Sequence, residues 1–207
     1  MSDLIRVHGT GKHEDDYITF GIEPKRILRD YDMYERFIKG CEHTVRKDDR
    51  YIAYIAKLKS AGLTHCAILG NIQEDDKVSL EMHHGPIFNL FDICDIVAKS
   101  MIKRGRIHDL TTFDIGDLVL TEHELDNIMI VMLSKTPHKG NHNNGRGIFI
   151  NIKATFGRLD RFLDRYHDGM EEEHHDYIAR YIAECKKAKG SIDNGLFDTA
   201  EQLRSFK

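Results

Sequence analysis

The sequence predicts a mainly helical protein of the α+β class. Apolar residues recur at helical spacing in residues 24–45, 48–62 and 171–190, whereas two shorter apolar runs, residues 78–84 and 127–134, have the patterns of strands. Apolar residues make up 41% of the chain and charged residues 31%, a balance that is typical of a folded globular protein rather than a disordered one.

The first half of the chain predicts two helices and a β-hairpin. Residues 24–45 begin at a proline, which suits a first helical turn, and residues 48–62 open on acids and end in a glycine. Residues 64–72 and 78–84 flank an acidic turn and predict the two strands of the hairpin. The second of these runs alternates, so that one face is apolar and His83 lies on the polar face.

The second half predicts further helices around one buried strand. Residues 88–105 and 111–125 are expected to be helical, and residues 127–134 form a continuous apolar run, most simply a buried strand. Thr136 followed by Pro137 then predicts the start of another helix, because a hydroxyl cap and a proline in the first turn are both start signals.

Four histidines gather at the ends of the predicted strands. His83 and His84 end one strand, and His138 and His142 lie at positions i and i+4 of the helix after the other. A pair at this spacing recurs in metal sites, but it indicates little alone, since the chain has 13 histidines and a second doublet, His174–His175, reads as surface. Three of the four histidines could hold a divalent cation while the fourth acts as a base in phosphodiester hydrolysis.

The segments EMHHG (81–85) and MLSKTPHKGNH (132–142) resemble the HNH, or ββα-metal, endonucleases, nearest to members with a His-His doublet and a final His-x-x-x-His. The sequence is also similar to HNH proteins encoded by large bacteriophages. The resemblance implies a ββα-metal core, a hairpin plus a helix, with a long helical insertion between its strands and flanking helices. The connection over residues 85–137 is longer than the compact motif usually has.

The resemblance also implies the roles of individual residues in a metal-dependent endonuclease that hydrolyses DNA phosphodiester bonds. His84 would be the general base, and Asn127 would hold that base in orientation, although Asn89 or Asn141 could serve instead. The ligands of the divalent metal (Mg²⁺, Mn²⁺ or Zn²⁺) would be His83, His138 and His142.

The charge distribution restricts DNA binding to a local face. The net charge of −4 counts against a general nucleic-acid binder. Basic residues nevertheless collect after the second predicted strand, and those expected to contact backbone phosphates are Lys135, Lys139 and Arg146. The same residues would equally form an ordinary solvated helix face.

Two non-enzymatic interpretations stay open. The four histidines could form a closed zinc site that staples the strand to the helix in a binding or structural protein with a degenerate nuclease fold. Alternatively there is no metal, and His83 is a strand-face residue beside an exposed helical turn. The chain has no GxSxG, Walker-type or GxGxxG motif that would indicate another enzyme class.

The chain is expected to form one compact unit with three regions: an N-terminal helical region (1–63), the ββα-metal core with its insertion (64–150) and a C-terminal helical region (151–207). Four separated cysteines indicate reduced thiols, and no apolar run approaches the roughly 20 residues that span a membrane. These features predict a protein in the cytoplasm of a bacterial host, without membrane contact, and are compatible with a homodimer.

Overall fold

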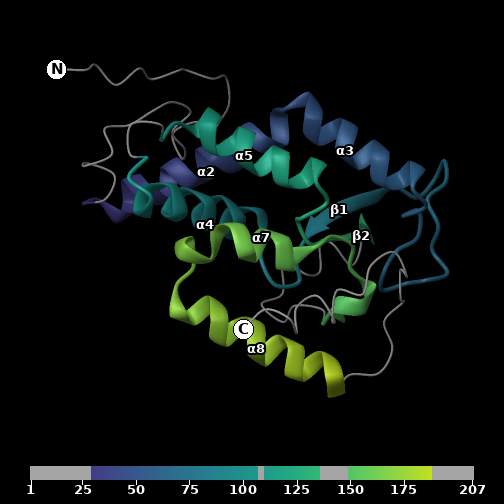
Figure 1. Ribbon diagram of the computed structural model, residues 1–207. Coiled ribbons are helices and arrows are strands. Elements are labelled where there is room, and N and C mark those ends of the chain that lie inside the picture. The colour runs from purple at the N-terminus through teal and green to yellow at the C-terminus, as the bar shows by residue number, and fades with distance from the viewer. Residues whose placement is uncertain (1–28, 107–109, 136–148, 188–207) are drawn as a thin grey trace.

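The computed structural model describes residues 29–106, 110–135 and 149–187. Within them it contains six α-helices and one two-stranded antiparallel sheet, which confirms the mainly helical α+β class. The elements in chain order (Figure 1) are α2 (Tyr31–Lys47), α3 (Asp49–Ser60), β1 (Leu80–His84), α4 (Leu90–Lys103), α5 (Thr112–Glu124), β2 (Ile130–Ser134), η3 (Ile152–Ala154), α7 (Leu159–Tyr166), η4 (His167–Gly169) and α8 (Glu172–Lys187).

The helices begin where the sequence provides a capping side chain. Asp30, Asp48, Asn89 and Thr111 accept hydrogen bonds from amides in the first turns of α2, α3, α4 and α5. At α4 the cap is reciprocal, because the carboxylate of Asp92 also accepts from the amide of Asn89. The helices predicted at residues 48–62, 88–105 and 111–125 are thereby confirmed as α3, α4 and α5.

Helix α4 lies at the centre of the fold. Helices α2 and α5 pack on one side of it, α7 and η4 pack on the other, and α3 packs on α5 (Figure 1). A helix with neighbours on several sides must be apolar over most of its surface. The buried residues of α4 are apolar except for Asp95 and Ser100: Leu90, Ile93, Cys94, Asp95, Ile96, Val97, Ala98, Ser100 and Met101.

The two strands pair with each other although α4 and α5 lie between them in the chain. They are antiparallel, with His84 opposite Ile130. Along β1 the side chains of Leu80, Met82 and His84 are buried and that of His83 is half-buried, so the predicted alternation is confirmed. Every residue of β2 is buried, as expected from its continuous apolar sequence.

The hairpin predicted between residues 64–72 and β1 is wrong. The first segment forms no strand, because it turns back on itself, and the amide of Cys66 donates to the carbonyl of Ile72 (2.9 Å). The segment also makes a hydrogen bond to β2, since the amide of Ala67 donates to the carbonyl of Met132 (2.9 Å). The β2 strand, whose residues are all buried, takes the position beside β1.

Two glycines allow the C-terminal part to approach the core closely. A Cβ atom on Gly169 would lie 2.0 Å from the carbonyl oxygen of Ile96 in α4, and one on Gly157 would lie 2.1 Å from that of Ile128. Real side chains do not tolerate such distances, so these contacts of backbone with backbone require glycine.

Other predictions concern residues that the structure does not describe. The helix expected after Pro137 lies outside the described residues, as do residues 1–28.

The division of the chain into the regions 1–63, 64–150 and 151–207 stays a prediction. No helix in the described part of the chain is both long enough and apolar enough to cross a membrane.

Candidate functional site

The histidine doublet at the end of β1 is divided between two environments. His83 is half-buried, whereas only 4% of the surface of His84 is exposed, although both residues border the same surface pocket. This division follows from strand geometry, because successive side chains point to opposite faces. The two imidazoles of the doublet therefore cannot serve one site in the same way.

His84 is paired with a second buried histidine, His123 of α5. Their Nε2 atoms are 2.9 Å apart, and His123 Nδ1 lies 2.7 Å from the carbonyl oxygen of Val119. Since a carbonyl can only accept, the proton of a neutral His123 is on Nδ1, and its Nε2 accepts. The proton between the two rings therefore belongs to His84 Nε2, which donates to His123.

Burial keeps both imidazoles uncharged. Burial is the largest cause that lowers the pKa of His84 well below its usual value, followed by the charge of His123, and burial lowers the pKa of His123 to about 4. The ring of Tyr51 stacks on His84 with centroids 6.0 Å apart, and Tyr54 meets His123 edge to face at 5.3 Å. A ring with these neighbours is a poor base toward solvent water.

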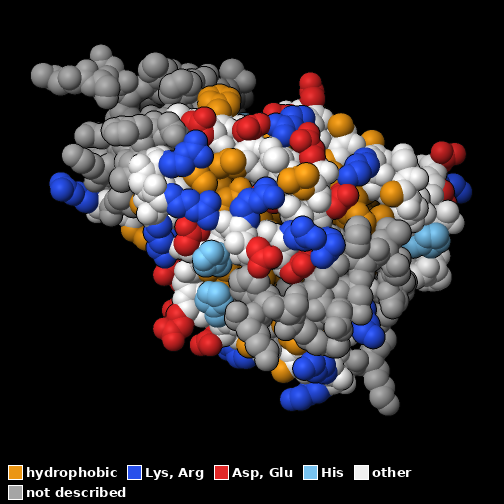
Figure 2. All heavy atoms as spheres, viewed as in Figure 1, with side chains coloured by type: hydrophobic (Ala, Val, Ile, Leu, Met, Phe, Trp, Pro, Cys, Tyr) orange, Lys and Arg blue, Asp and Glu red, His pale blue; other side chains and the backbone are white. Residues whose placement is uncertain are grey.

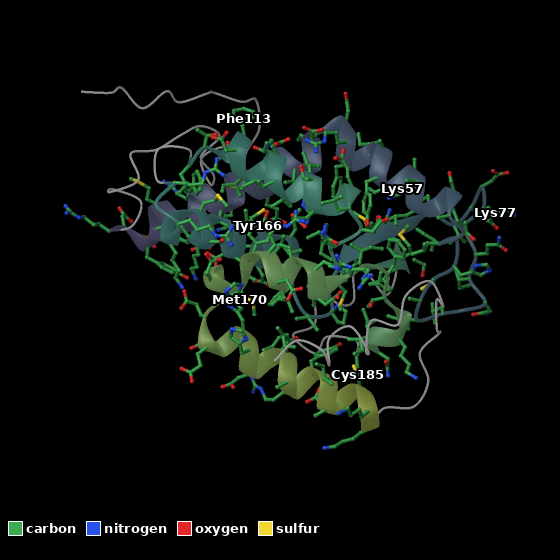
Figure 3. The ribbon with its side chains drawn as sticks, in the orientation of Figure 1. Lys57, Lys77, Phe113, Tyr166, Met170 and Cys185 are labelled. Carbon is green, nitrogen blue, oxygen red and sulfur yellow. The ribbon has the colours of Figure 1, made fainter. Side chains whose placement is uncertain are left out.

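Asn127, expected to orient the base, belongs to a different network. Its side-chain amide donates to Glu122 Oε2 (2.7 Å), and Arg165 pairs with Glu122 Oε1 (2.5 Å). The hydroxyl of Tyr166, labelled on α7 in Figure 3, donates to the same Oε1 atom (3.3 Å). Three donors thus compensate the fully buried carboxylate of Glu122, and Asn127 makes no hydrogen bond to His84.

The pocket beside His83 lies between the turn after β1 and the first half of α8. Its volume is about 590 Å³. Its walls combine imidazoles with aromatic rings, including a T-shaped contact between Phe88 and His174 with centroids 5.6 Å apart. The hydroxyl of Tyr177 donates to the carbonyl of Pro86 (3.3 Å) and links the two walls. A partly buried Asp92 also lines the pocket, and burial raises the pKa of its carboxyl group.

The expected metal site stays a prediction. In the described residues no group of three or more His, Cys, Asp or Glu side chains is arranged to hold a metal ion. Two of the expected ligands, His138 and His142, lie outside the described residues. The same holds for Lys139 and Arg146, whereas Lys135 is exposed directly after β2.

Sequence reasoning missed the two residues that organise the polar interior, Glu122 and His123. They lie side by side in the segment TEHEL of α5, which reads as a solvated helix surface. Both are nevertheless buried, with 0% and 1% of their surface exposed. A local sequence pattern gives no signal for their partners, since Arg165 and His84 come from distant parts of the chain.

Comparison with known proteins assigns this chain to a family. The model of a family described as Bacteriophage G278-like virion protein matches residues 12–204. No curated protein and no solved structure matches the chain. The matched range includes every residue that the structure describes.

This match contradicts the resemblance to HNH endonucleases. The expectations of a metal-dependent endonuclease that hydrolyses DNA, and of an enzyme at all, are wrong, while the bacteriophage origin fits. The geometry gives a physical reason for the correction. The residue taken as general base is buried in a histidine pair, and the residue taken to orient it holds a buried glutamate.

Proposed function

The chain belongs to the Bacteriophage G278-like virion protein family, and from this premise we propose that it is a non-enzymatic structural component of the phage particle. The observation on which the proposal rests is the extent of the match, which leaves only the ends of the chain outside residues 12–204. The protein would be made in the cytoplasm of the infected bacterium and then join the particle.

The packing of the polar residues supports a structural role. The pairs His84–His123 and Asn127–Glu122 satisfy buried polar atoms within the protein instead of presenting them to a substrate. In this proposal β1 and β2, with α4 and α5 inserted between them, form a scaffold that positions the outer helices. They would not form a catalytic ββα-metal core.

Protein analysis of purified virions tests the proposal directly. Particles of the phage that encodes the chain are purified by density-gradient centrifugation, and peptides of the chain are quantified by mass spectrometry. We expect the chain to be enriched with the particles at a constant ratio to the major capsid protein, while a phage protein of nucleotide metabolism is depleted. A chain that is abundant in the lysate and missing from the particles would contradict the structural role.

A cleavage assay separates this role from the enzyme interpretation. Supercoiled plasmid is incubated with the wild-type protein and with His84→Ala, each with magnesium, with manganese and with EDTA. We expect no nicking by either protein under any of these conditions. Metal-dependent nicking by the wild type that His84→Ala abolishes would restore a catalytic function.

A non-catalytic metal staple is compatible with the proposal and has its own test. Its ligands would be the four histidines of the closed site, His83 and His84 of β1 with His138 and His142. In that case EDTA lowers the melting temperature of the wild type and has no further effect on His83→Ala. Equal melting with and without EDTA, together with no bound metal in elemental analysis, would exclude the staple.

A further inference from the structure

Two arginines of α7 and the arginine that precedes this helix line a second pocket, beside the turn that follows α5. Arg158 is the N-cap residue of α7, and Arg161 and Arg165 are four residues apart on one face of the helix. The volume of this pocket, here called the arginine pocket, is about 490 Å³. Its remaining lining residues are Leu125, Asn127 and Asp164.

The arginine pocket has donor capacity that the described residues do not use. Arg165 pairs with Glu122, and Arg158 pairs with Asp160 at 3.2 Å. Among the described residues, the buried atoms Arg158 Nε and Asp160 Oδ1 have no hydrogen-bond partner, and no side chain pairs with the exposed guanidinium of Arg161. An anion in the pocket would satisfy the donors of Arg161.

A carboxylate on a short aliphatic stem fits the pocket better than a DNA backbone does. A guanidinium group matches a carboxylate with two parallel hydrogen bonds, and the stem would cover Leu125, of which 52% is exposed. Duplex DNA requires an extended basic surface. The chain instead has a net charge of −4, and acidic and basic side chains are interspersed on the face that carries α7 (Figure 2).

The start of α8 presents carboxylates of this kind. Glu172 and Glu173 lie in its first turn, both are exposed, and no described residue pairs with either side chain. Figures 1 and 2 show acidic side chains over this end of α8, on the same face of the molecule as α7. When two complementary patches lie on one face, two copies related by a two-fold axis can form both contacts at once.

We propose that this chain forms a two-fold dimer in which Glu172 or Glu173 of each copy enters the arginine pocket of the other. The inference goes beyond the proposed function, because a virion protein need not pair with itself. The contacts are between partly exposed charges, so the association is weak and is reduced by salt. Closure by a two-fold axis stops the assembly at two copies.

Charge reversal in the full chain tests the dimer. Sedimentation equilibrium over a range of protein concentrations, at low and at high sodium chloride, gives the association constant. The wild type is expected to form dimers and no larger species at low salt. Arg161→Glu alone, and Glu172→Lys with Glu173→Lys, are each expected to lower the association constant by about tenfold or more. The control Arg180→Glu changes an exposed arginine outside the pocket and leaves the constant unchanged.

Mixing the variants gives the decisive result. An equimolar mixture of the Arg161→Glu protein and the Glu172→Lys/Glu173→Lys protein has opposite charges at both contacts, so heterodimers form more strongly than either variant associates with itself. Circular dichroism confirms that each variant is folded. A wild type that stays monomeric, or a mixture that does not associate, overturns the inference. Binding of duplex DNA or of another acidic protein through Arg161, without self-association, also overturns it, while presence of the chain in virions would still support the proposed function.

Discussion

The Nε2 atoms of His84 and His123 face each other across 2.9 Å, and a single proton lies between them. The carbonyl of Val119 fixes its direction, because it holds the other proton of the pair on His123 Nδ1. Two side chains that are usually charged near pH 6 therefore act here as neutral hydrogen-bonding groups of the core. Adding a further proton to either ring would place a positive charge in the core. Burial opposes that charge, and for His84 so does any charge on His123.

This pair makes the free energy of unfolding depend on pH. The pKa of each imidazole is lower in the folded than in the unfolded protein. The free energy of unfolding is therefore at its full value above about pH 6.5, and it decreases as the pH falls towards the pKa of the folded state. His123 has a pKa of about 4 in the folded protein, and its ionisation alone should lower the free energy of unfolding by about 3 kcal/mol when the pH falls from neutral to 4.

Urea denaturation at several pH values above 5 measures this slope while most carboxylates stay ionised. His123→Gln should flatten the slope, and His65→Gln, which changes an exposed histidine, should leave it as in the wild type. A wild-type stability that is constant over this pH range would contradict the neutral histidine pair.

Asn127→Ala is expected to destabilise the protein by about 1–3 kcal/mol. The substitution removes the donor to Glu122 Oε2 and leaves a buried carboxylate oxygen without that partner. Chemical denaturation measures the loss. The matched control is Asn71→Ala in an exposed turn, which should change the stability by less than about 0.5 kcal/mol. Equal effects of the two substitutions would mean that Asn127 has no special part in holding Glu122.

Gly169→Ala is expected to destabilise the protein by about 1–3 kcal/mol or more, because the added methyl group meets the carbonyl of Ile96 in α4. Gly62→Ala separates steric overlap from backbone strain. Gly62 has a φ of +101° and no atom within 4 Å of an added Cβ, so an alanine at this position introduces backbone strain without steric overlap. Thermal melts of both variants compare the two effects, and a native melting temperature for Gly169→Ala would place η4 farther from α4.

Arg50→Ala is expected to destabilise the protein by about 1 kcal/mol or less. Arg50 of α3 pairs with Asp117 and Glu124 of α5, at 2.5 and 2.8 Å, but the three side chains are partly or largely exposed, and solvent weakens the attraction. The difference from the wild type should shrink at high salt. The control Lys39→Ala removes an exposed pair with Glu35 within one helix, and an Arg50 effect that grows with salt would contradict an electrostatic origin.

Local features of the fold could be predicted from the sequence, and contacts between distant segments could not. The caps Asp48, Asn89 and Thr111 act on amides within three residues, so their helices are visible in the sequence alone. The acidic turn is also local, since Asp75 accepts from the amides that follow it. A turn of that kind suggested a hairpin, but the partner of β1 is decided by burial over the whole fold.

The same limit applied to the candidate site. The alternation along β1 correctly predicted that His83 lies on the more exposed face of the strand, because strand geometry depends only on neighbouring residues. The partner of His84 comes from α5, where His123 follows a glutamate and precedes another. Its position in the core depends on how α5 packs against α2, α3 and α4, which no local pattern records.

The pairing of β1 with β2 has a consequence for how the chain is made. While the ribosome is still adding α4 and α5, the backbone N–H and C=O groups of β1 have no partner strand. Pairing the two strands closes the loop of residues 85–129. The chain loses entropy on this closure before the contacts between the strands form, which slows folding. The sheet therefore forms only after Ile130–Ser134 has emerged, and a nascent chain that stops after α5 remains open to premature association with its neighbours on the same messenger RNA.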